Sequence, residues 1–199
     1  QDVMDAKLVG DHLKVPYKII DLTETYNALL VALNAKDNNT ISRMALANIK
    51  PRLRMATLYY YSSLNNYLVV GTGNKSEIFI GYYTKYGDGG VDLSPIADLM
   101  KSDVFALAEY LKVPHSIQTA APTDGLFGDS RTDEEQLGAS YDELEWAMVE
   151  VEKNKTIEDF FGREKEVFSI YKRLNSANKH KMQPIPICIL PKKHNKNDD

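Results

Sequence analysis

Side chains that could do chemistry gather in residues 69–103. A short apolar run there ends in the turn Gly71-Thr72-Gly73, and Glu77 follows four residues later. Glycines let the backbone approach a ligand closely, the Thr72 hydroxyl can donate a hydrogen bond, and a carboxylate beside phosphates is a typical Mg²⁺ ligand. On their own, the glycines and Thr72 fit an ordinary strand-to-helix turn about as well as a binding site, and Glu77 by itself is better interpreted as a solvated helix glutamate.

A second turn, residues 87–90, reads Gly-Asp-Gly-Gly and lies between Lys85 and Asp92. A lysine can meet a phosphate or a carboxylate, and an aspartate can accept hydrogen bonds from ribose or amide groups. Packing alone gives no reason for a turn this rich in glycine, so we favour a ligand site over a simple turn. Lys101 stands on the approach to a helix whose N-terminal dipole favours anions, and a phosphate contact and a surface lysine fit its position equally well.

Basic residues outside these turns are the next candidates. Arg52 and Arg54 do not share a helix face, so one can bind a ligand while the other forms a structural pair. His180-Lys181 is either a mobile basic clamp or part of an exposed terminus. Cys188 stands in an apolar run, where we expect a buried structural thiol, and the four histidines are scattered. With no convincing nucleophile, the chemistry is that of positioning and electrostatics on a polyanion, as in ATP-dependent transfer.

The elements that must position these groups follow the helix, loop and strand order of a parallel α/β sheet, whose ligands sit at the carboxyl ends of strands. The long helical stretch over residues 41–66, interrupted at Pro51, is so apolar that it indicates either packing within the domain or a subunit interface. The sequence predicts a helix over residues 2–13, a second over 24–34 with Thr23 as its cap, and a third that is capped by Ser94 or Ser102 and ended by Pro114. It also predicts surface helices over 141–152 and 157–176. Strands are predicted over 17–22, 67–70 and, at a sheet edge, 184–191.

Composition limits the possible function classes. The chain has 199 residues, of which 43% are hydrophobic, so we expect a single domain over 1–199 with a normal core and a frayed tail at 192–199. A net charge of −4 argues against a nucleic-acid partner. The single cysteine excludes an intrachain disulfide and a cysteine-rich zinc site, which fits the cytoplasm. No apolar run approaches the roughly 20 residues of a membrane span.

Five sequence blocks together resemble the ammonia-dependent NAD⁺ synthetase family over roughly residues 1–185. They read GTGNKSE, GYYTKYGDGGVDLSPIADLMKSDV, APTDGL, DEEQLGASYDELE and, near the end, HK. The resemblance implies an α/β fold of the ATP pyrophosphatase type, a Rossmann-like parallel sheet flanked by helices on both faces. It also implies that ATP adenylates the nicotinate carboxylate of deamido-NAD and that ammonia then displaces AMP, giving NAD⁺.

Site residues follow from the same resemblance, position by position. Glu77 would hold Mg²⁺, and the protein would be a homodimer with deamido-NAD near the interface. No residue is assigned to a covalent or acid–base step. The expected ATP contacts are Thr72, Lys101 and Thr123, and the expected deamido-NAD contacts are Arg52, Lys85, Asp92, His180 and Lys181.

The chain also departs from the family pattern. The phosphate loop Ser-Gly-Gly-x-Asp-Ser is absent, and we expect it, with the first strand, upstream of Gln1. Ala47-Asn48 replaces a usual Gly-Asn, and no glutamine-hydrolysing domain is present, so ammonia would come from solution or from another protein. Two alternatives stay open: another ATP pyrophosphatase, such as a GMP synthetase-like amidase or a tRNA thiolase, and a non-catalytic fragment. The loop over residues 120–136 is predicted to be a mobile lid.

Overall fold

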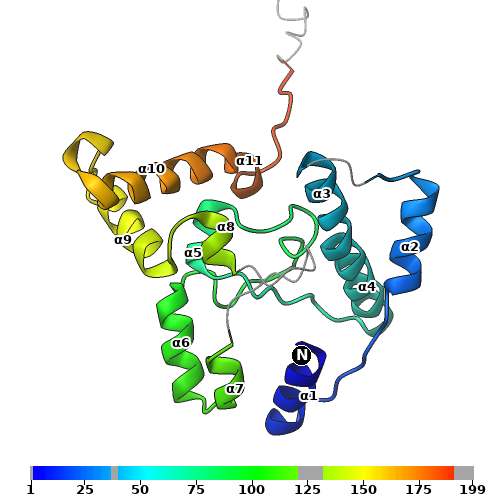
Figure 1. Ribbon diagram of the computed structural model, residues 1–199. Coiled ribbons are helices and arrows are strands. Elements are labelled where there is room, and N and C mark those ends of the chain that lie inside the picture. Colours follow the sequence, from blue (N-terminus) through cyan, green and yellow to red (C-terminus); the bar gives the residue numbers. More distant parts are fainter. Residues whose placement is uncertain (1, 37–39, 121–131, 191–199) are drawn as a thin grey trace, which may run out of the picture.

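A computed structural model describes residues 2–36, 40–120 and 132–190 of the chain. Figure 1 shows helices joined by irregular segments, with α5 and α8 near the centre, α2, α3 and α4 on one side of them, α9 and α10 on the other, and α11 above them at the inner end of α10. The helices are α1 (Asp2–Leu13), α2 (Thr23–Ala32), α3 (Thr40–Ala47), α4 (Ile49–Asn65), α5 (Lys75–Ile80), α6 (Lys101–Tyr110), α7 (His115–Gln118), α8 (Asp133–Leu137), α9 (Tyr141–Glu152), the 3-10 turn η1 (Ile157–Asp159), α10 (Gly162–Ala177) and α11 (Lys179–Met182).

The expected parallel sheet is not seen within the described ranges. Residues 67–70 contribute one isolated parallel bridge, between Val70 and Leu93, and Gly71 N donates to the Leu93 carbonyl at 2.7 Å. The strand expected over residues 17–22 is wrong for this structure, since that segment is irregular and Tyr17 and Ile19 are half exposed. A strand needs a neighbour for its backbone groups, and the described residues place none beside this segment. The sheet itself stays a prediction.

Several helix bounds are confirmed, whereas the predicted caps are wrong. The two helices over residues 41–66 divide at Asn48, and Pro51 lies in the first turn of α4, where backbone N–H groups lack helical partners. Helix α2 begins at Thr23 itself, whose N–H donates to Asp21 Oδ1 at 2.8 Å, so Thr23 is not the cap. Neither predicted serine caps α6; its N-cap is Met100. Pro114 lies beyond the end of α6 and caps α7 instead.

The hydrophobic core lies where α5, α9 and α10 meet. Helix α9, predicted to be a surface helix, is central to it, because its apolar residues recur at helical spacing on one face. The ring of Phe160 packs against both Trp146 and Phe168, with centroids 5.0 and 4.9 Å away. The buried members of this core are Ile80, Leu137, Ala139, Leu144, Ala147, Met148, Phe160, Val167, Phe168 and Tyr171.

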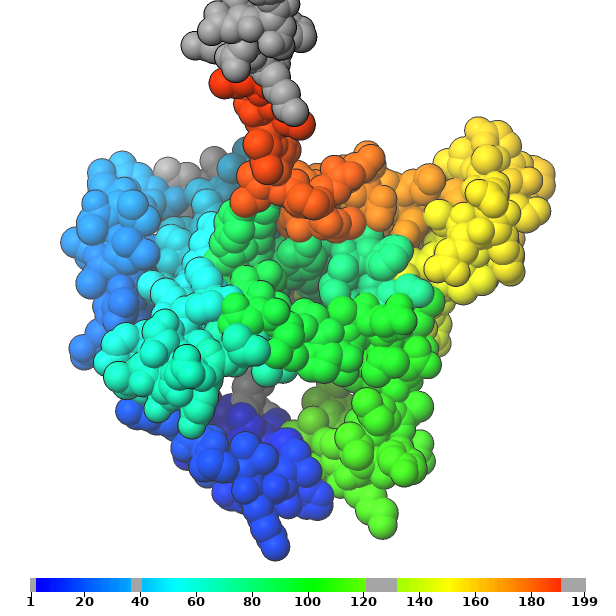
Figure 2. Space-filling view, turned by 180° about the vertical axis from the view of Figure 1, so that it is seen from behind, coloured from blue at the N-terminus to red at the C-terminus, as the bar shows by residue number. Residues whose placement is uncertain are grey.

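Apolar side chains elsewhere are left uncovered by the described residues. Val31 on α2 is 81% exposed, and Leu58 and Leu64 on α4 are more than half exposed. Residues 183–190 leave the body of the molecule as an extended arm (Figure 2). They form no strand, and Cys188 is exposed, so the predicted edge strand and buried thiol are both wrong. None of the helices in the described ranges is long and apolar enough to cross a membrane.

Candidate active site

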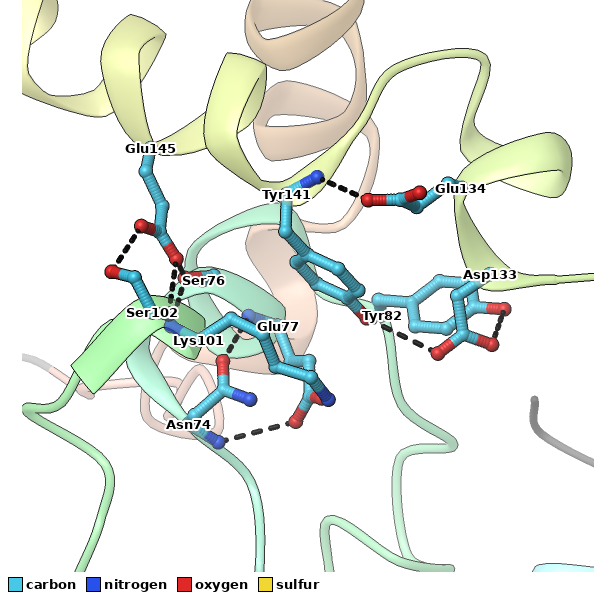
Figure 3. A network of polar contacts seen from close by, with 10 residues as sticks. All are labelled: Asn74, Ser76, Glu77, Tyr82, Lys101, Ser102, Asp133, Glu134, Tyr141 and Glu145. Atoms are coloured by element: carbon cyan, nitrogen blue, oxygen red, sulfur yellow. Dashed lines mark hydrogen bonds and ion pairs between the residues drawn. The ribbon is translucent and has the colours of Figure 1, made fainter. Parts of the chain in front are cut away.

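A capping box at the start of α5 orients Glu77. Asn74 Oδ1 accepts from Glu77 N at 3.0 Å, and Glu77 Oε2 accepts from Asn74 N at 3.2 Å. This reciprocal pair satisfies two N–H groups that a helix start leaves open, which explains why an Asn-x-x-Glu sequence begins a helix here. The free edge of the carboxylate then meets Lys101, whose ammonium lies 3.0 Å from Glu77 Oε1 (Figure 3). Two predicted site residues, one for metal and one for ATP, are thus brought into contact.

The N-terminus of α6 is already occupied by protein groups. Lys101 N donates to Ser76 Oγ at 3.0 Å, and Ser102 N donates to Glu145 Oε1 at 3.2 Å. Met100 N donates to Asp103 Oδ2 at 2.9 Å. The backbone N–H groups at this helix end are therefore taken by protein oxygens, one of them from the Glu145 carboxylate. In the described part of the chain, the Lys101 ammonium is the group at this helix end that we expect to meet a phosphate.

Two tyrosines and a buried aspartate lie beside Lys101 (Figure 3). The hydroxyls of Tyr82 and Tyr141 donate to the two carboxylate oxygens of Asp133 at 3.1 and 3.2 Å. The Lys101 ammonium lies 4.9 Å from the centre of the Tyr141 ring, within reach of a cation–π interaction. Burial first, and then the charges of Asp133 and Glu77, raise the pKa of Tyr141. The Tyr141 phenol therefore stays neutral and donates its hydrogen bond over the whole physiological range.

Glu77 can bind a magnesium ion if substrate oxygens and waters supply the other ligands. The described residues contain no group of three or more His, Cys, Asp or Glu that could enclose a metal ion. Mg²⁺ is, however, commonly held by one or two carboxylates together with waters and substrate phosphates. Glu77 is fixed through Oε2 and paired through Oε1, with its side chain 19% exposed, so it can supply one such carboxylate.

The second glycine-rich turn is built around Thr84. Its N–H donates to Asp88 Oδ1 at 3.0 Å, its carbonyl accepts from Gly87 N at 2.9 Å, and its hydroxyl donates to Asn48 Oδ1 at 2.6 Å. A Cβ at Gly89 would lie 2.3 Å from the Tyr83 ring. The argument that packing gives no reason for these glycines is therefore wrong: the ring of Tyr83 closes directly on the turn.

Four of the five residues predicted to contact deamido-NAD meet along residues 81–85, which lead into this turn. Lys85 Nζ donates to the carbonyl of His180 at 2.6 Å, across 95 residues of sequence. Arg52 Nη2 donates to the Lys85 carbonyl at 3.4 Å, so Arg52 is the arginine of the Arg52/Arg54 pair with a contact to Lys85. Lys181 Nζ donates to the carbonyls of Gly81 and Tyr83 at 2.7 and 2.8 Å. The basic C-terminal segment therefore lies on the turn, with the imidazole of His180 exposed.

The fifth residue, Asp92, joins the two glycine-rich turns. Its Oδ2 accepts from Val69 N at 2.7 Å, and its Oδ1 accepts from the Tyr59 hydroxyl at 3.1 Å. Burial, followed by this hydrogen bond, raises the pKa of Tyr59. Thr72 is exposed on the first turn, two residues beyond the bridge at Val70. The remaining predicted ATP contact, Thr123, lies outside the described residues, as does most of the expected lid over 120–136.

Sequence reasoning missed the polar residues that hold this site together: Ser76, Tyr82, Ser102, Asp133, Tyr141 and Glu145. Two signals were present. Asn74 and Glu77 stand at capping-box spacing, which indicates a fixed rather than a solvated glutamate. Glu145 stands on the buried stripe of α9, one turn after Tyr141, and a carboxylate there needs hydrogen-bond partners.

The arrangement of the two turns is that of a protein that binds a phosphate-bearing ligand. Two glycine-rich turns hold charged side chains of both signs at fixed positions, which suits a phosphate-bearing ligand with several polar groups. The chain belongs to the NAD synthase family, whose sequence profile matches residues 1–185.

Relatives and solved structures agree with that assignment. The NH(3)-dependent NAD(+) synthetase of Carboxydothermus hydrogenoformans is 44% identical over 163 residues, which cover 82% of this chain and 67% of that protein. The structure of an NMN synthetase from Francisella tularensis superposes with a TM-score of 0.79 at 30% identity, covering 96% of this chain and 73% of that one. An NH3-dependent NAD synthetase from Campylobacter jejuni gives 0.69 at 29% identity, covering 94% and 72%.

Proposed function

We propose that this protein makes NAD⁺ from deamido-NAD, ATP and ammonia, releasing AMP and pyrophosphate. The observation that carries the proposal is the match to the NAD synthase family over residues 1–185, which includes both glycine-rich turns and the basic C-terminal segment. The arrangement of the site supports it, since Lys85, Arg52 and Lys181 come from three separate parts of the chain and meet along residues 81–85. The family match argues against another ATP pyrophosphatase, whereas the alternative of a fragment without catalysis is tested by the turnover assay below.

The reaction needs activation because a free carboxylate is a poor electrophile. A nicotinate oxygen attacks the α-phosphorus of ATP, and the bond from that phosphorus to the bridging oxygen of pyrophosphate breaks. Ammonia then adds to the acyl carbon, and AMP leaves with the electron pair of the acyl–oxygen bond, while the ammonia nitrogen loses a proton. Each step is favoured by holding the reactants in place and by fixed positive charge near the phosphates.

The ATP side of the site uses the first turn and α6. In this proposal Thr72 and Lys101 contact ATP, together with Thr123. Glu77 supplies a carboxylate to Mg²⁺, which would neutralise phosphate charge when bound. Because the Lys101 ammonium lies 3.0 Å from Glu77 Oε1, the lysine side chain is already held in place before a phosphate arrives. A phosphate then shares or replaces the carboxylate as the partner of Lys101.

The deamido-NAD side uses the second turn and the C-terminal segment. Arg52 and Lys85 supply positive charge, Asp92 accepts hydrogen bonds, and His180 and Lys181 close over the substrate. The hydrogen bond from the Lys85 ammonium to the His180 carbonyl supports this closure, because it holds the C-terminal segment beside Lys85. The homodimer and the cytoplasmic location stay predictions from the family resemblance and from composition.

The direct test is a turnover assay on the full-length protein. Deamido-NAD, Mg-ATP and ammonium are supplied, and NAD⁺ and AMP are separated by chromatography. The proposal requires NAD⁺ that depends on ammonium and appears in equal amount with AMP. AMP without NAD⁺, or no product with an ATP-binding protein, contradicts it.

A Lys85→Met variant tests the assignment of the second turn. Loss of the ammonium, and of its hydrogen bond to the His180 carbonyl, should raise KM for deamido-NAD by about tenfold or more while KM for ATP stays close to wild type, since a hydrogen bond to a charged group contributes about 1.5–3 kcal/mol. Lys165→Met, an exposed lysine on α10, is the matched control. Equal increases in KM for deamido-NAD and for ATP would show that Lys85 is not specific to the deamido-NAD site.

A second substrate merits inclusion because of the superposition with an NMN synthetase. By its name that protein makes the mononucleotide. Nicotinate mononucleotide should therefore be supplied in competition with deamido-NAD. A higher kcat/KM for the mononucleotide would show that the protein carries out the same amidation on the smaller substrate.

A further inference from the structure

A carboxylate on α9 caps the start of α6 from outside that helix. Glu145 Oε1 accepts from Ser102 N at 3.2 Å and from Ser76 Oγ at 2.8 Å, and its Oε2 accepts from Ser102 Oγ at 2.6 Å (Figure 3). The residue is only 9% exposed, and Ser76 is fully buried. A buried carboxylate is stable when several donors satisfy it, and here the N-terminal dipole of α6 points toward it as well.

The hydrogen bonds continue to Lys101. Ser76 Oγ, which donates to Glu145, accepts from Lys101 N at 3.0 Å. Glu145 therefore reaches the backbone of Lys101 through Ser76 and the backbone of the next residue directly. Because these bonds fix the first turn of α6, they fix the point from which the Lys101 side chain departs toward Glu77.

The same face of α9 also meets the far end of Lys101. Tyr141 lies one helical turn before Glu145, at the spacing that places two side chains on one face. Its ring centre is 4.9 Å from the Lys101 ammonium, and its hydroxyl is held by Asp133. Helix α9 thus reaches the Lys101 backbone indirectly, from Glu145 through Ser76, and contacts the ammonium directly through the Tyr141 ring.

We propose that Glu145 is a positioning residue for Lys101: it sets the start of α6 so that the lysine ammonium points to the phosphates of ATP. This rests on the proposed function in one respect, the contact between Lys101 and ATP. Glu145 touches no substrate in this proposal. The competing role is a general one in folding, in which Glu145 only holds α5, α6 and α9 together.

The test compares Glu145→Gln with Glu143→Gln in the full-length protein. Glutamine keeps the shape and one acceptor oxygen of Glu145 but removes the charge. We expect KM for ATP to rise about tenfold, equivalent to about 1.4 kcal/mol. We expect KM for deamido-NAD to stay within about twofold. Glu143→Gln weakens an ion pair with Arg163 on α10 and keeps a side chain suited to the capping box at Ser140. It should lower stability without changing KM for ATP.

A double variant separates positioning from folding. If Glu145 acts through Lys101, then Glu145→Gln added to Lys101→Ala should weaken ATP binding by no more than about twofold further. A full additional tenfold loss, or an equal rise in both KM values for Glu145→Gln alone, overturns the proposal. Equilibrium binding of Mg-ATP gives the same comparison without turnover. If the native protein makes no NAD⁺, the proposed function fails, and weaker Mg-ATP binding by Glu145→Gln still supports the positioning role, whereas unchanged binding overturns it.

Discussion

Replacing Lys181 by methionine tests whether this residue anchors the C-terminal segment to the rest of the protein or instead contacts the substrate directly. The Lys181 ammonium donates to two carbonyls, those of Gly81 and Tyr83, at 2.7 and 2.8 Å. It also lies 5.4 Å from the centre of the Tyr83 ring. Methionine keeps most of the apolar stem and removes every donor. The variant therefore cuts the attachment of α11 to the turn that carries Lys85.

Two effects of opposite sign set the magnitude. Losing hydrogen bonds from a charged group to two carbonyls costs up to about 3 kcal/mol for each bond in a dry site, and about half of that where water reaches the carbonyls. Burial lowers the pKa of Lys181 from its ordinary value of 10.5, against the charge of Asp88, so removing the ammonium also relieves a desolvation cost. The net loss should be about 1–2 kcal/mol, or about 2–8 °C in Tm for a domain of this size.

The sign of the pH dependence follows from the same shift. The folded pKa of Lys181 lies below the unfolded value, so the unfolded state binds more protons between the two. The cost of burying the charged amine is therefore absent above pH 10.5 and reaches its full size once the pH has fallen below the folded pKa, where it offsets part of the gain from the two hydrogen bonds. Wild type should gain stability relative to Lys181→Met as the pH approaches 10.5.

Thermal unfolding followed by circular dichroism measures the stability loss, and a turnover assay measures KM for deamido-NAD. Lys179→Met, on the same short helix but exposed, is the control and should stay within about 0.5 kcal/mol of wild type. If Lys181 is an anchor, its variant loses stability and gains KM together. A raised KM with an unchanged Tm would refute the anchor and leave Lys181 as a direct substrate contact.

Two further predictions concern stability. Hydrogen bonds from Arg163 lower the pKa of Glu143 to about 2 from 4.5, so Glu143 contributes stability above pH 4.5 that is lost toward pH 2. In acid titrations monitored by fluorescence, wild type should lose about 1 kcal/mol more than Glu143→Gln, because solvent screens this exposed pair. Gly81→Ala should lower Tm by about 5 °C, since Gly81 has a φ of +67° and a Cβ would lie 2.2 Å from Asn178 Cβ. Gly138→Ala shares the positive φ but meets its neighbour only at 3.7 Å, so a similar Tm for the two alanine variants would contradict the steric argument.

Local signals in the sequence predicted much of the helical structure. The bounds of α1 and α9 follow from apolar spacing, and the break between α3 and α4 falls near Pro51 as expected. Both glycine-rich turns lie where the sequence placed them, with Lys85 and Asp92 held by specific contacts. These features depend on residues close in sequence, where periodicity and backbone preference act directly.

Features that depend on distant residues could not be predicted in the same way. Nothing near Cys188 in sequence shows that residues 183–190 extend away from the body, so its apolar surroundings suggested burial. The apolar run over residues 17–22 has the composition of a strand, but a strand also requires a neighbour in space. Glu145 acts on Ser102, 43 residues away, and only the packing of α9 against α6 reveals that contact.

Helix α5 connects the two halves of the proposed site. Its first turn carries Glu77, paired with Lys101 on the ATP side, and the glycine at its C-terminal end, Gly81, accepts from Lys181 on the deamido-NAD side. Six residues of helix span only about 9 Å. The distance between the groups proposed to hold the two substrates is therefore set by one short, rigid element, buried at Ser76 and Ile80. An attack of a carboxylate on a phosphorus gains its rate from such fixed separation, because a bimolecular step becomes effectively unimolecular. Changes at either end of α5 should then alter kcat more than they alter the binding of either substrate alone.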